Sequence, residues 1–250
     1  MLRHRVIPLV LLDGYSVVKT IQFDIRRNLG NPIVVSRIYN NRNVDELVLL
    51  DIDAAKEGRS IDSLTVSAVA KECFMPLTVG GGLRSCDDIA KILASGADKV
   101  SLNAIIHESP DVIFQAVSRF GSQCIIASID IKHEGKGNYR VFSHAGKDVK
   151  FSLDEVLELL NKAKVGEVLL NSVDHDGVMD GYDIDLINYV SLRVNMPLIV
   201  AGGASKVEDC TTAINNGASA VAAASIFHFT SITPKDCKDD MFINGISVRL

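Results

Sequence analysis

Short apolar runs alternate with amphipathic stretches along most of the chain, and each such pair predicts a β-strand followed by an α-helix. Residues 77–104 show the unit most clearly. An apolar run at 77–79 stops at three glycines, and apolar residues then recur at helical spacing behind Ser85, which can cap a helix. Gly96 ends that helix, and residues 97–102 form a second apolar run. The stretch therefore predicts a βαβ unit, in which the crossover between parallel strands is almost always right-handed.

The same unit occurs a second time. Residues 198–226 repeat the glycine turn and the helix 121 positions further along, so that Gly82 matches Gly203 without a gap. The other matching segments are 46–52 with 167–173 and 6–11 with 125–130. Because internal repeats determine architecture, four strand–helix units in each half predict eight in the whole chain. The predicted fold class is α/β, a (β/α)8 TIM barrel built from two repeated half-barrels.

The remaining pattern predicts the other elements. Strands are expected at 5–12, 47–52, 124–130 and 167–172, and helices from 32 onward and at 61–73, 110–120, 153–163 and 232–245. Residues 139–143 alternate in polarity and predict a hairpin inserted after the fifth strand. The polar segment 13–31 is expected to be a long loop, of the kind that often covers an active site.

Composition narrows the class of protein. With 250 residues and 47% apolar content the chain can bury one large core, and we expect a single domain over residues 1–250. The net charge of −5 and the lack of basic clusters argue against nucleic acid as a partner. No apolar run approaches the ~18 residues of a membrane span, and the apolar start is too short for a signal peptide. The five cysteines share no metal-ligand spacing, so we expect reduced thiols, no metal and no cofactor in a cytoplasmic protein.

Two phosphate-binding turns follow from the repeat. Active sites of such barrels form at the carboxyl ends of the strands, where both glycine turns lie. The first cradle would comprise Gly82, Ser101 and Asn103, and the second Gly203, Ala224 and Ser225. A small molecule with a phosphate at each end would suit this pair, although the turns could instead serve folding alone.

Further polar residues are placed at the same end. Asp130 ends an apolar strand, where a carboxylate favours a raised pKa and acid–base catalysis, although it could instead cap a loop amide. Asp51 ends the second strand. Asp176 and Gly177 lie in a loop that resembles part of a calcium loop but lacks the glutamate at its twelfth position. Lys19, in the long polar segment, could reach a phosphate or could simply be a solvated surface residue.

Charged residues begin four of the strands. Arg5, Glu46, Lys99 and Glu167 lie at or near the starts of strands one, two, four and six. Glu46 and Glu167 are repeat mates, so they should face each other across the amino end of the barrel. Because surface ion pairs contribute little to stability, a closed ring of these charges could be a gate. Ordinary salt bridges on the rim are the alternative.

Several motifs resemble the cyclase subunit of imidazole glycerol phosphate synthase over essentially the whole chain. They are DELVLLDI, VGGGLRS, GADKVSLN, FGSQCII, SID at 128–130, DHDGVMDGYD, AGGAS and AASIFHF. The resemblance implies a carbon–nitrogen lyase or synthase whose barrel receives ammonia from a glutaminase subunit, its heterodimer partner, docked on the amino-terminal face. Ammonia would then pass through the barrel to a bis-phosphorylated substrate. The four charged residues would be the ammonia gate, and Asp98 would lie at the partner interface.

One position departs from the family pattern. The cyclase uses two aspartates, at the ends of strands one and five. Asp130 takes the second role, but the first position is Leu11, which is also the repeat mate of Asp130. Asp13 has the right parity to substitute, although it lies in the following segment. A leucine cannot transfer a proton, which argues against imidazole ring formation.

The pattern VLLDGYSVVKT, together with a substrate-site residue at Asn171, is similar to a branch of the family associated with glycosyl amidation. That branch implies ammonia delivery for acetamidino sugars of surface glycans, with a separate enzyme activating the sugar. Our first hypothesis is therefore an ammonia-channelling barrel that serves amidation of a phosphorylated or nucleotide-linked sugar. The alternatives are an active imidazole glycerol phosphate synthase subunit of histidine biosynthesis and a silent barrel that activates its glutaminase.

Overall fold

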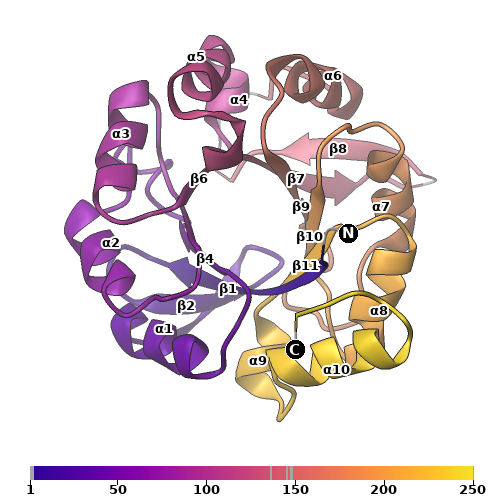
Figure 1. Ribbon diagram of the computed structural model, residues 1–250. Coiled ribbons are helices and arrows are strands. Elements are labelled where there is room, and N and C mark those ends of the chain that lie inside the picture. Colours follow the sequence, from indigo (N-terminus) through magenta and orange to yellow (C-terminus); the bar gives the residue numbers. More distant parts are fainter. Residues whose placement is uncertain (1–2, 136, 145, 147–148, 250) are drawn as a thin grey trace.

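Eight parallel strands close into a barrel, seen along its axis in Figure 1. The computed structural model describes residues 3–135, 137–144, 146 and 149–249. The barrel strands are β1 (Arg5–Leu12), β4 (Leu47–Asp51), β5 (Leu77–Gly80), β6 (Lys99–Leu102), β7 (Ile125–His133), β9 (Glu167–Ser172), β10 (Leu198–Ala201) and β11 (Ala220–Ala223). Their hydrogen-bonded order follows the chain, and β11 pairs with β1 to close the ring. The predicted (β/α)8 barrel is confirmed.

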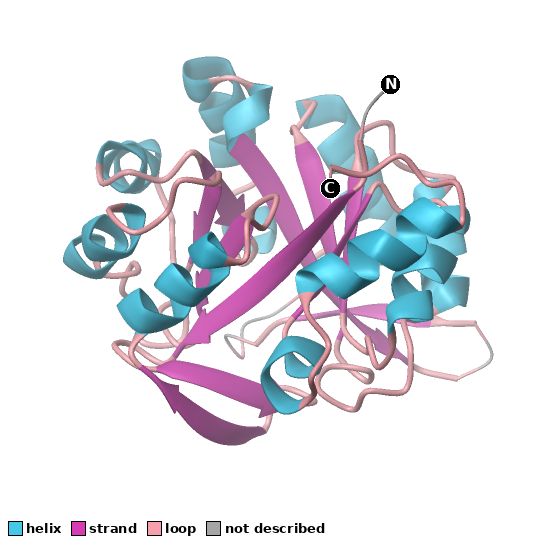
Figure 2. Cartoon of the chain, turned by 60° about the horizontal axis from the view of Figure 1, so that its bottom comes forward, coloured by secondary structure: helices cyan, strands magenta, loops and turns pink. Residues whose placement is uncertain are grey.

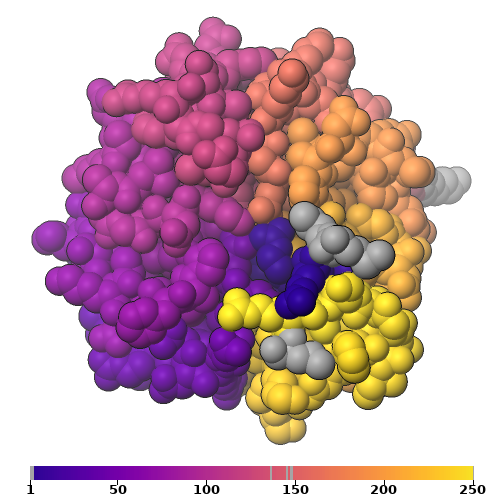
Figure 3. All heavy atoms as spheres, in the orientation of Figure 1, coloured from indigo at the N-terminus to yellow at the C-terminus, as the bar shows by residue number. Residues whose placement is uncertain are grey.

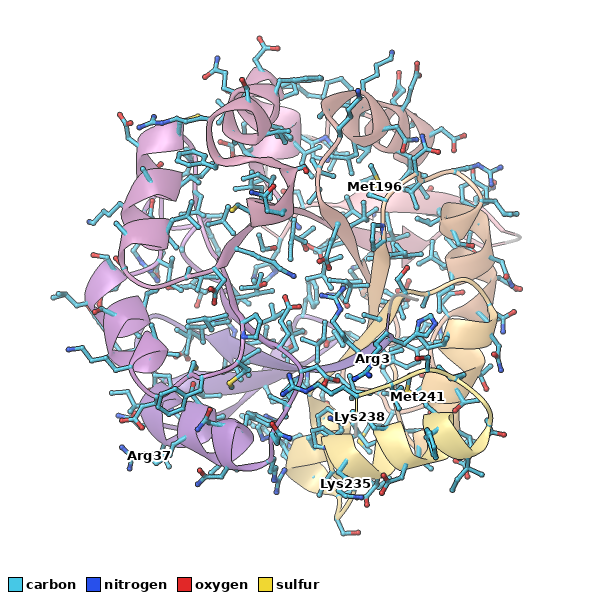
Figure 4. The ribbon with its side chains drawn as sticks, in the orientation of Figure 1. Arg3, Arg37, Met196, Lys235, Lys238 and Met241 are labelled. Atoms are coloured by element: carbon cyan, nitrogen blue, oxygen red, sulfur yellow. The ribbon has the colours of Figure 1, made fainter. Side chains whose placement is uncertain are left out.

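Helices form a layer around the barrel (Figure 1). They are α1 (Pro32–Asn41), α2 (Ser63–Ala70), α3 (Cys86–Ala94), α4 (Ile105–Glu108), α5 (Asp111–Phe120), the 3-10 helix η1 (Ser122–Cys124), α6 (Leu153–Ala163), α7 (Ile184–Ser191), α8 (Val207–Asn215), α9 (Ser225–Phe229) and α10 (Pro234–Ile243). Two helices start later than their apolar patterns indicated, because Asp62 and Thr233 cap them and accept hydrogen bonds from backbone N–H groups. Arg37 on α1 and Lys235 on α10 point outward into solvent (Figure 4).

The repeat fixes equivalent elements in both halves. β5, α3 and β6 match β10, α8 and β11, each 121 residues later. The Ser85 hydroxyl accepts a hydrogen bond from the Asp88 N–H, and the Asp88 carboxylate accepts one from the Ser85 N–H. In the second half the Asp209 carboxylate accepts hydrogen bonds from the N–H groups of Ser205 and Lys206. A first-turn aspartate therefore caps this helix in both halves.

Alternation of side chains along the strands separates two apolar cores. The larger core lies between the strands and the helices and includes Val6, Leu49 and Val79. A second cluster fills the inside of the barrel: Ile7, Leu9, Leu11, Val18, Val48, Ile126, Leu169, Ile199, Ala201, Ala220, Ala222 and Ala224. We call the amino ends of the strands the floor and their carboxyl ends the mouth. The apolar interior separates the floor from the mouth.

The expectation that residues 13–31 form a loop is wrong. The segment contains β2 (Val17–Ile21), which pairs antiparallel with the end of β1 and with β3 (Ile25–Gly30). The first four residues of β2 are buried, so the strand has side chains to hold it on the barrel. Gln22 and Phe23 form the turn with positive φ angles, although neither is a glycine. The absence of a glycine turn signal is why the sequence did not indicate a hairpin.

The predicted hairpin after the fifth barrel strand is confirmed. β8 (Tyr139–Phe142) pairs antiparallel with the end of β7, and Asp130 lies opposite Phe142. Figure 2 shows the barrel from the side, with hairpin strands at the end opposite both termini.

Both ends of the described chain meet on the floor. The His4 N–H donates to the Ser247 carbonyl at 2.8 Å, and His4 forms an isolated bridge with Val248. Figure 3 shows this face, with indigo residues of the amino-terminal segment beside yellow residues of the carboxyl-terminal segment. All five cysteines are free thiols, as expected. Within the described residues no helix is long and apolar enough to cross a membrane.

The two-core arrangement predicts where truncation destabilises the chain. Leu160→Ala, at a fully buried position on α6, should lower the free energy of unfolding by about 2–5 kcal/mol because it leaves a cavity. Leu64→Ala on α2, where the leucine is 78% exposed, should change it by less than about 0.5 kcal/mol. Urea unfolding measures both. Equal losses would contradict the packing described.

Candidate active site

The mouth opens into a funnel that reaches down to Leu9 and Leu169 of the barrel interior. Polar side chains near its base are Ser101, Asn103, Ser128, Asp130 and Asn171. Ser101 lies on β6 and Asn103 directly follows it. Ser128 and Asp130 lie on β7, and Asn171 lies on β9. The closed barrel therefore brings together residues that are far apart in the sequence, as expected for the active end of this fold.

Asp130 lies in the funnel lining and is 8% exposed. Asn103 donates from Nδ2 to its Oδ2 at 2.8 Å, and Asn171 donates from Nδ2 to its Oδ1 at 3.4 Å. Burial raises the pKa of Asp130 to about 6; the two amide donors oppose this, and the charge of Asp176 adds to it. The carboxylate is thus ionised near neutral pH and still able to accept a proton. Its partners are side-chain amides, not the loop amide considered as the alternative.

Leu11 forms part of the β1 wall of the same funnel and is 5% exposed. It packs in the apolar cluster inside the barrel. Asp13 does not replace the missing carboxylate, because it lies outside the funnel lining and its N–H turns back to the Ser16 carbonyl. On the β1 side, the funnel that holds Asp130 therefore has an apolar wall.

The three residues of the first predicted cradle lie together, and their binding of phosphate stays a prediction. Gly82, Ser101 and Asn103 all line the funnel. Gly82 has a φ of +63°, and a Cβ there would lie 1.9 Å from the Arg59 carbonyl oxygen, so only glycine fits. Arg84 follows the turn and also lines the funnel; the sequence pattern did not single it out.

The second cradle lies beside the funnel. Its lining includes Gly177, Gly203, Ala224 and Ser225, together with Lys19. A Cβ at Gly203 would lie 1.9 Å from a backbone oxygen. The Ser225 Oγ is buried without a hydrogen-bond partner among the described residues. A buried hydroxyl of this kind normally has a partner, which an oxygen of a bound anion would supply.

Lys19 is not the solvated surface residue that was one alternative. It lies on β2, is 4% exposed, and its Nζ is 2.9 Å from Oδ1 of Asp176. Thr20 donates from Oγ1 to the other oxygen of Asp176. The hairpin thereby places the ammonium group of Lys19 at the edge of the second cradle, and the ion pair with Asp176 holds it there.

Asp51 lines the funnel, but its carboxylate oxygens already have hydrogen-bond and ion-pair partners within the protein. They accept hydrogen bonds from the N–H groups of Asp53 and Ala54, and Oδ2 lies 2.5 Å from Nη1 of Arg59. Asp51 therefore holds the loop after β4, which in turn packs against Gly82.

The four charges predicted at the floor form a closed ring. Arg5 lies 2.5 Å from Glu46 and 2.7 Å from Glu167, and Lys99 lies 3.1 Å and 2.8 Å from the same two carboxylates. Burial alone would raise the pKa of Glu167, but hydrogen bonds and charge contacts with both cations hold it below its ordinary value. Each cation bridges both glutamates across the barrel axis. Asp98, the predicted interface residue, is exposed beside Lys99.

Known proteins are similar to this sequence over its full length. The family model described as histidine biosynthesis protein matches residues 5–233. The chain is 47% identical over 250 residues to a Campylobacter jejuni protein whose name, given as provisional, is imidazole glycerol phosphate synthase subunit hisF2. It is 44% identical over 253 residues to imidazole glycerol phosphate synthase subunit HisF of Dictyoglomus turgidum, and 43% over 251 residues to that of Endomicrobium trichonymphae. These matches cover all of this chain and between 96% and 100% of the relatives.

The chain belongs to the HisF family of imidazole glycerol phosphate synthase subunits. The resemblance drawn from the motifs is confirmed at this level. The comparisons do not extend it to the glycosyl-amidation branch.

Besides Arg84, two aromatic funnel residues of this HisF-family chain were not indicated by the sequence patterns. Phe23, at the tip of the β2–β3 hairpin, and His144, after β8, both line the funnel and pack edge to face with ring centroids 5.6 Å apart. Burial lowers the pKa of His144 and so favours its neutral form. The contact joins hairpins separated by about half the chain, and no local signal in the sequence indicates it.

Asp130→Asn should have a higher free energy of unfolding than the unmodified protein, and this difference should grow as the pH rises from about 4 to about 7. The folded-state pKa of about 6 exceeds the ordinary 3.8, so the folded state binds the proton more tightly and loses stability as the pH rises through this window. A shift of that size corresponds to roughly 3 kcal/mol at neutral pH. Urea unfolding of both proteins at several pH values measures it. A difference that does not vary with pH would show that Asp130 is not a buried carboxylate.

Proposed function

We propose that this chain is the ammonia-using barrel subunit of a glutamine-dependent imidazole glycerol phosphate synthase. The observation that carries the proposal is the difference between the two ends of the barrel. The floor has a closed ring of charges, the interior is apolar, and the mouth has Asp130 beside two glycine cradles. The names of the relatives support this reading over sugar amidation, because each refers to imidazole glycerol phosphate synthase.

Ammonia enters through the floor from a glutaminase partner docked there, beside Asp98. The ring is closed in this structure, because Arg5 and Lys99 each bridge both glutamates. Passage requires at least one of these bridges to open. Above the ring the interior is apolar, which favours neutral ammonia over ammonium because burial of an unpaired charge is costly.

The substrate is a small molecule with two phosphates, one for each cradle. Backbone N–H groups of the glycine turns are suited to bind phosphate oxygens. In the second cradle Lys19 adds a positive charge and Ser225 adds a hydroxyl without another partner among the described residues. Between the cradles the substrate's reacting carbon lies over Asp130, at the base of the funnel.

Asp130 acts as the general base. The ammonia nitrogen uses its lone pair to form the new bond to a carbonyl carbon of the substrate, the C=O π bond opens and its electron pair moves to the oxygen, and the nitrogen gives up a proton to the Asp130 carboxylate. A base with a pKa near the working pH is well matched to this transfer. Asn103 and Asn171 orient the carboxylate through its two oxygens.

Leu11 favours a second candidate function, delivery of ammonia for amidation of a phosphorylated or nucleotide-linked sugar of a surface glycan. Ring closure needs a second proton transfer on the β1 side of the funnel, and Leu11 provides no group for it. When ammonia attacks a sugar that another enzyme has activated, the activating group leaves with the electron pair of its bond to carbon, and the only proton to be removed is one on nitrogen, for which Asp130 suffices.

A direct assay separates the candidates. The purified chain, incubated with the aminated bis-phosphate precursor and an ammonium salt, should form imidazole glycerol phosphate. Leu11→Asp should increase the rate about 10²-fold, because it supplies the second acid–base group. Product formation is followed by chromatography.

Leu11→Asn is the matched control, since it introduces a polar group of similar size that cannot exchange a proton, and it should leave the rate unchanged. No product from either the unmodified chain or Leu11→Asp would refute the first proposal. Sugar amidation, or a silent barrel that only activates its glutaminase, would then remain.

The floor ring predicts a separation of two activities. Lys99→Ala should change glutamine-dependent turnover of the complex about tenfold while leaving ammonia-dependent turnover within twofold, because the substitution affects entry and not chemistry. Lys162→Ala, which removes an exposed lysine paired with Glu158 on α6, should change neither. Equal losses in both assays of Lys99→Ala would count against a gate.

A further inference from the structure

We infer that the buried ion pair between Lys238 and Asp45 holds Glu46 in place as the fixed side of the floor ring, and so positions the ring for ammonia entry. The inference rests on the proposed function. It adds two residues outside the ring, one of them on α10 near the end of the chain.

The two glutamates of the ring are held unequally. The Glu46 side chain is 1% exposed and accepts a hydrogen bond from Thr78 Oγ1 at 2.7 Å in addition to its bonds with Arg5 and Lys99. The Glu167 side chain is 15% exposed and binds the same two cations, but the repeat mate of Thr78 beside it is Ile199, which has no hydroxyl. Glu46 is therefore the fixed side of the ring, and opening occurs on the Glu167 side.

Asp45 secures the backbone on the fixed side. It directly precedes Glu46, and its Oδ2 accepts a hydrogen bond from the Val6 N–H at 3.2 Å. Val6 directly follows Arg5, so one side chain connects the backbone beside both members of the Arg5–Glu46 pair. Asp45 therefore fixes the backbone beside Arg5 relative to the backbone of Glu46.

Lys238 in turn holds Asp45. Its Nζ lies 3.4 Å from Oδ1 of Asp45 and 3.4 Å from the Asn43 carbonyl oxygen. Both charged side chains are 5% exposed, so neither has water to replace its partner. Figure 4 shows Lys238 on the side of α10 that faces the barrel. The pair thus links α10 to the floor ring.

The described residues of the second half of the barrel include no equivalent of this link. The repeat mate of Asp45 is Gly166, where a Cβ would lie 2.2 Å from the Ser122 carbonyl oxygen, so no side chain fits. The Lys238–Asp45 pair therefore supports only the Glu46 side, in agreement with the unequal burial of the two glutamates.

The test is Lys238→Met, which keeps the aliphatic stem and removes the charge. In the complex with the glutaminase, the ratio of glutamine-dependent to ammonia-dependent turnover should change about tenfold, as for Lys99→Ala. The side-chain Nε–H resonance of Arg5 in the full chain should also shift. Lys162→Met, which replaces an exposed lysine on α6, is the matched control and should alter neither.

A double variant guards against loss of the fold. Asp45→Asn with Lys238→Met removes both buried charges together, and it should fold while still shifting the Arg5 resonance and the ratio. An Arg5 resonance that stays in place in both variants overturns the inference and leaves the proposed function intact. A shifted resonance with an unchanged ratio overturns both, because the ring would then not control ammonia entry.

Discussion

Alternation of side chains along eight parallel strands is the constraint on which the rest of this molecule depends. On β1 the residues Arg5, Ile7, Leu9 and Leu11 point into the barrel in succession, from the floor to the mouth. Shifting the register by one residue would exchange these for Val6, Val10 and Leu12, which pack against the helices. Closure of the barrel then places charge at one end, an apolar interior in the middle and the carboxylate of Asp130 at the other end.

The floor ring is not explained by stability. Glu46 is almost fully buried, and a buried carboxylate is tolerated only with charged and hydrogen-bonding partners, which Arg5, Lys99 and Thr78 supply. Replacing such a group with apolar residues is often neutral or stabilising, so its presence on the barrel axis points to a functional role. The cluster that fills the interior above it consists of aliphatic side chains. The charged ring lies at the floor and the carboxylate of Asp130 at the mouth, with this apolar cluster between them.

Much of this arrangement could be predicted from the sequence because the chain repeats itself. The 121-residue interval between Gly82 and Gly203 indicated the barrel, both cradles and the facing glutamates, and the structure confirms the closed barrel. The same symmetry identified Leu11 as the partner of Asp130. The prediction failed where structure depends on contacts distant in sequence. The segment 13–31 carries no glycine turn at Gln22 and Phe23, so its hairpin, and with it the burial of Lys19 against Asp176, could not be recognised locally. The Lys238–Asp45 pair likewise joins residues nearly 200 positions apart.

The central claim is that nitrogen travels inside the barrel from the floor to Asp130. In the most direct measurement, the complex of this chain with a glutaminase is incubated with glutamine that carries ¹⁵N in its side-chain amide, in the presence of excess unlabelled ammonium. Mass spectrometry then determines the ¹⁵N content of the aminated product. Transfer through the barrel predicts that the product nitrogen is mostly ¹⁵N, whatever the amount of ammonium in solution. A label diluted in proportion to the unlabelled ammonium would contradict it, because the nitrogen would then have left the protein before reacting.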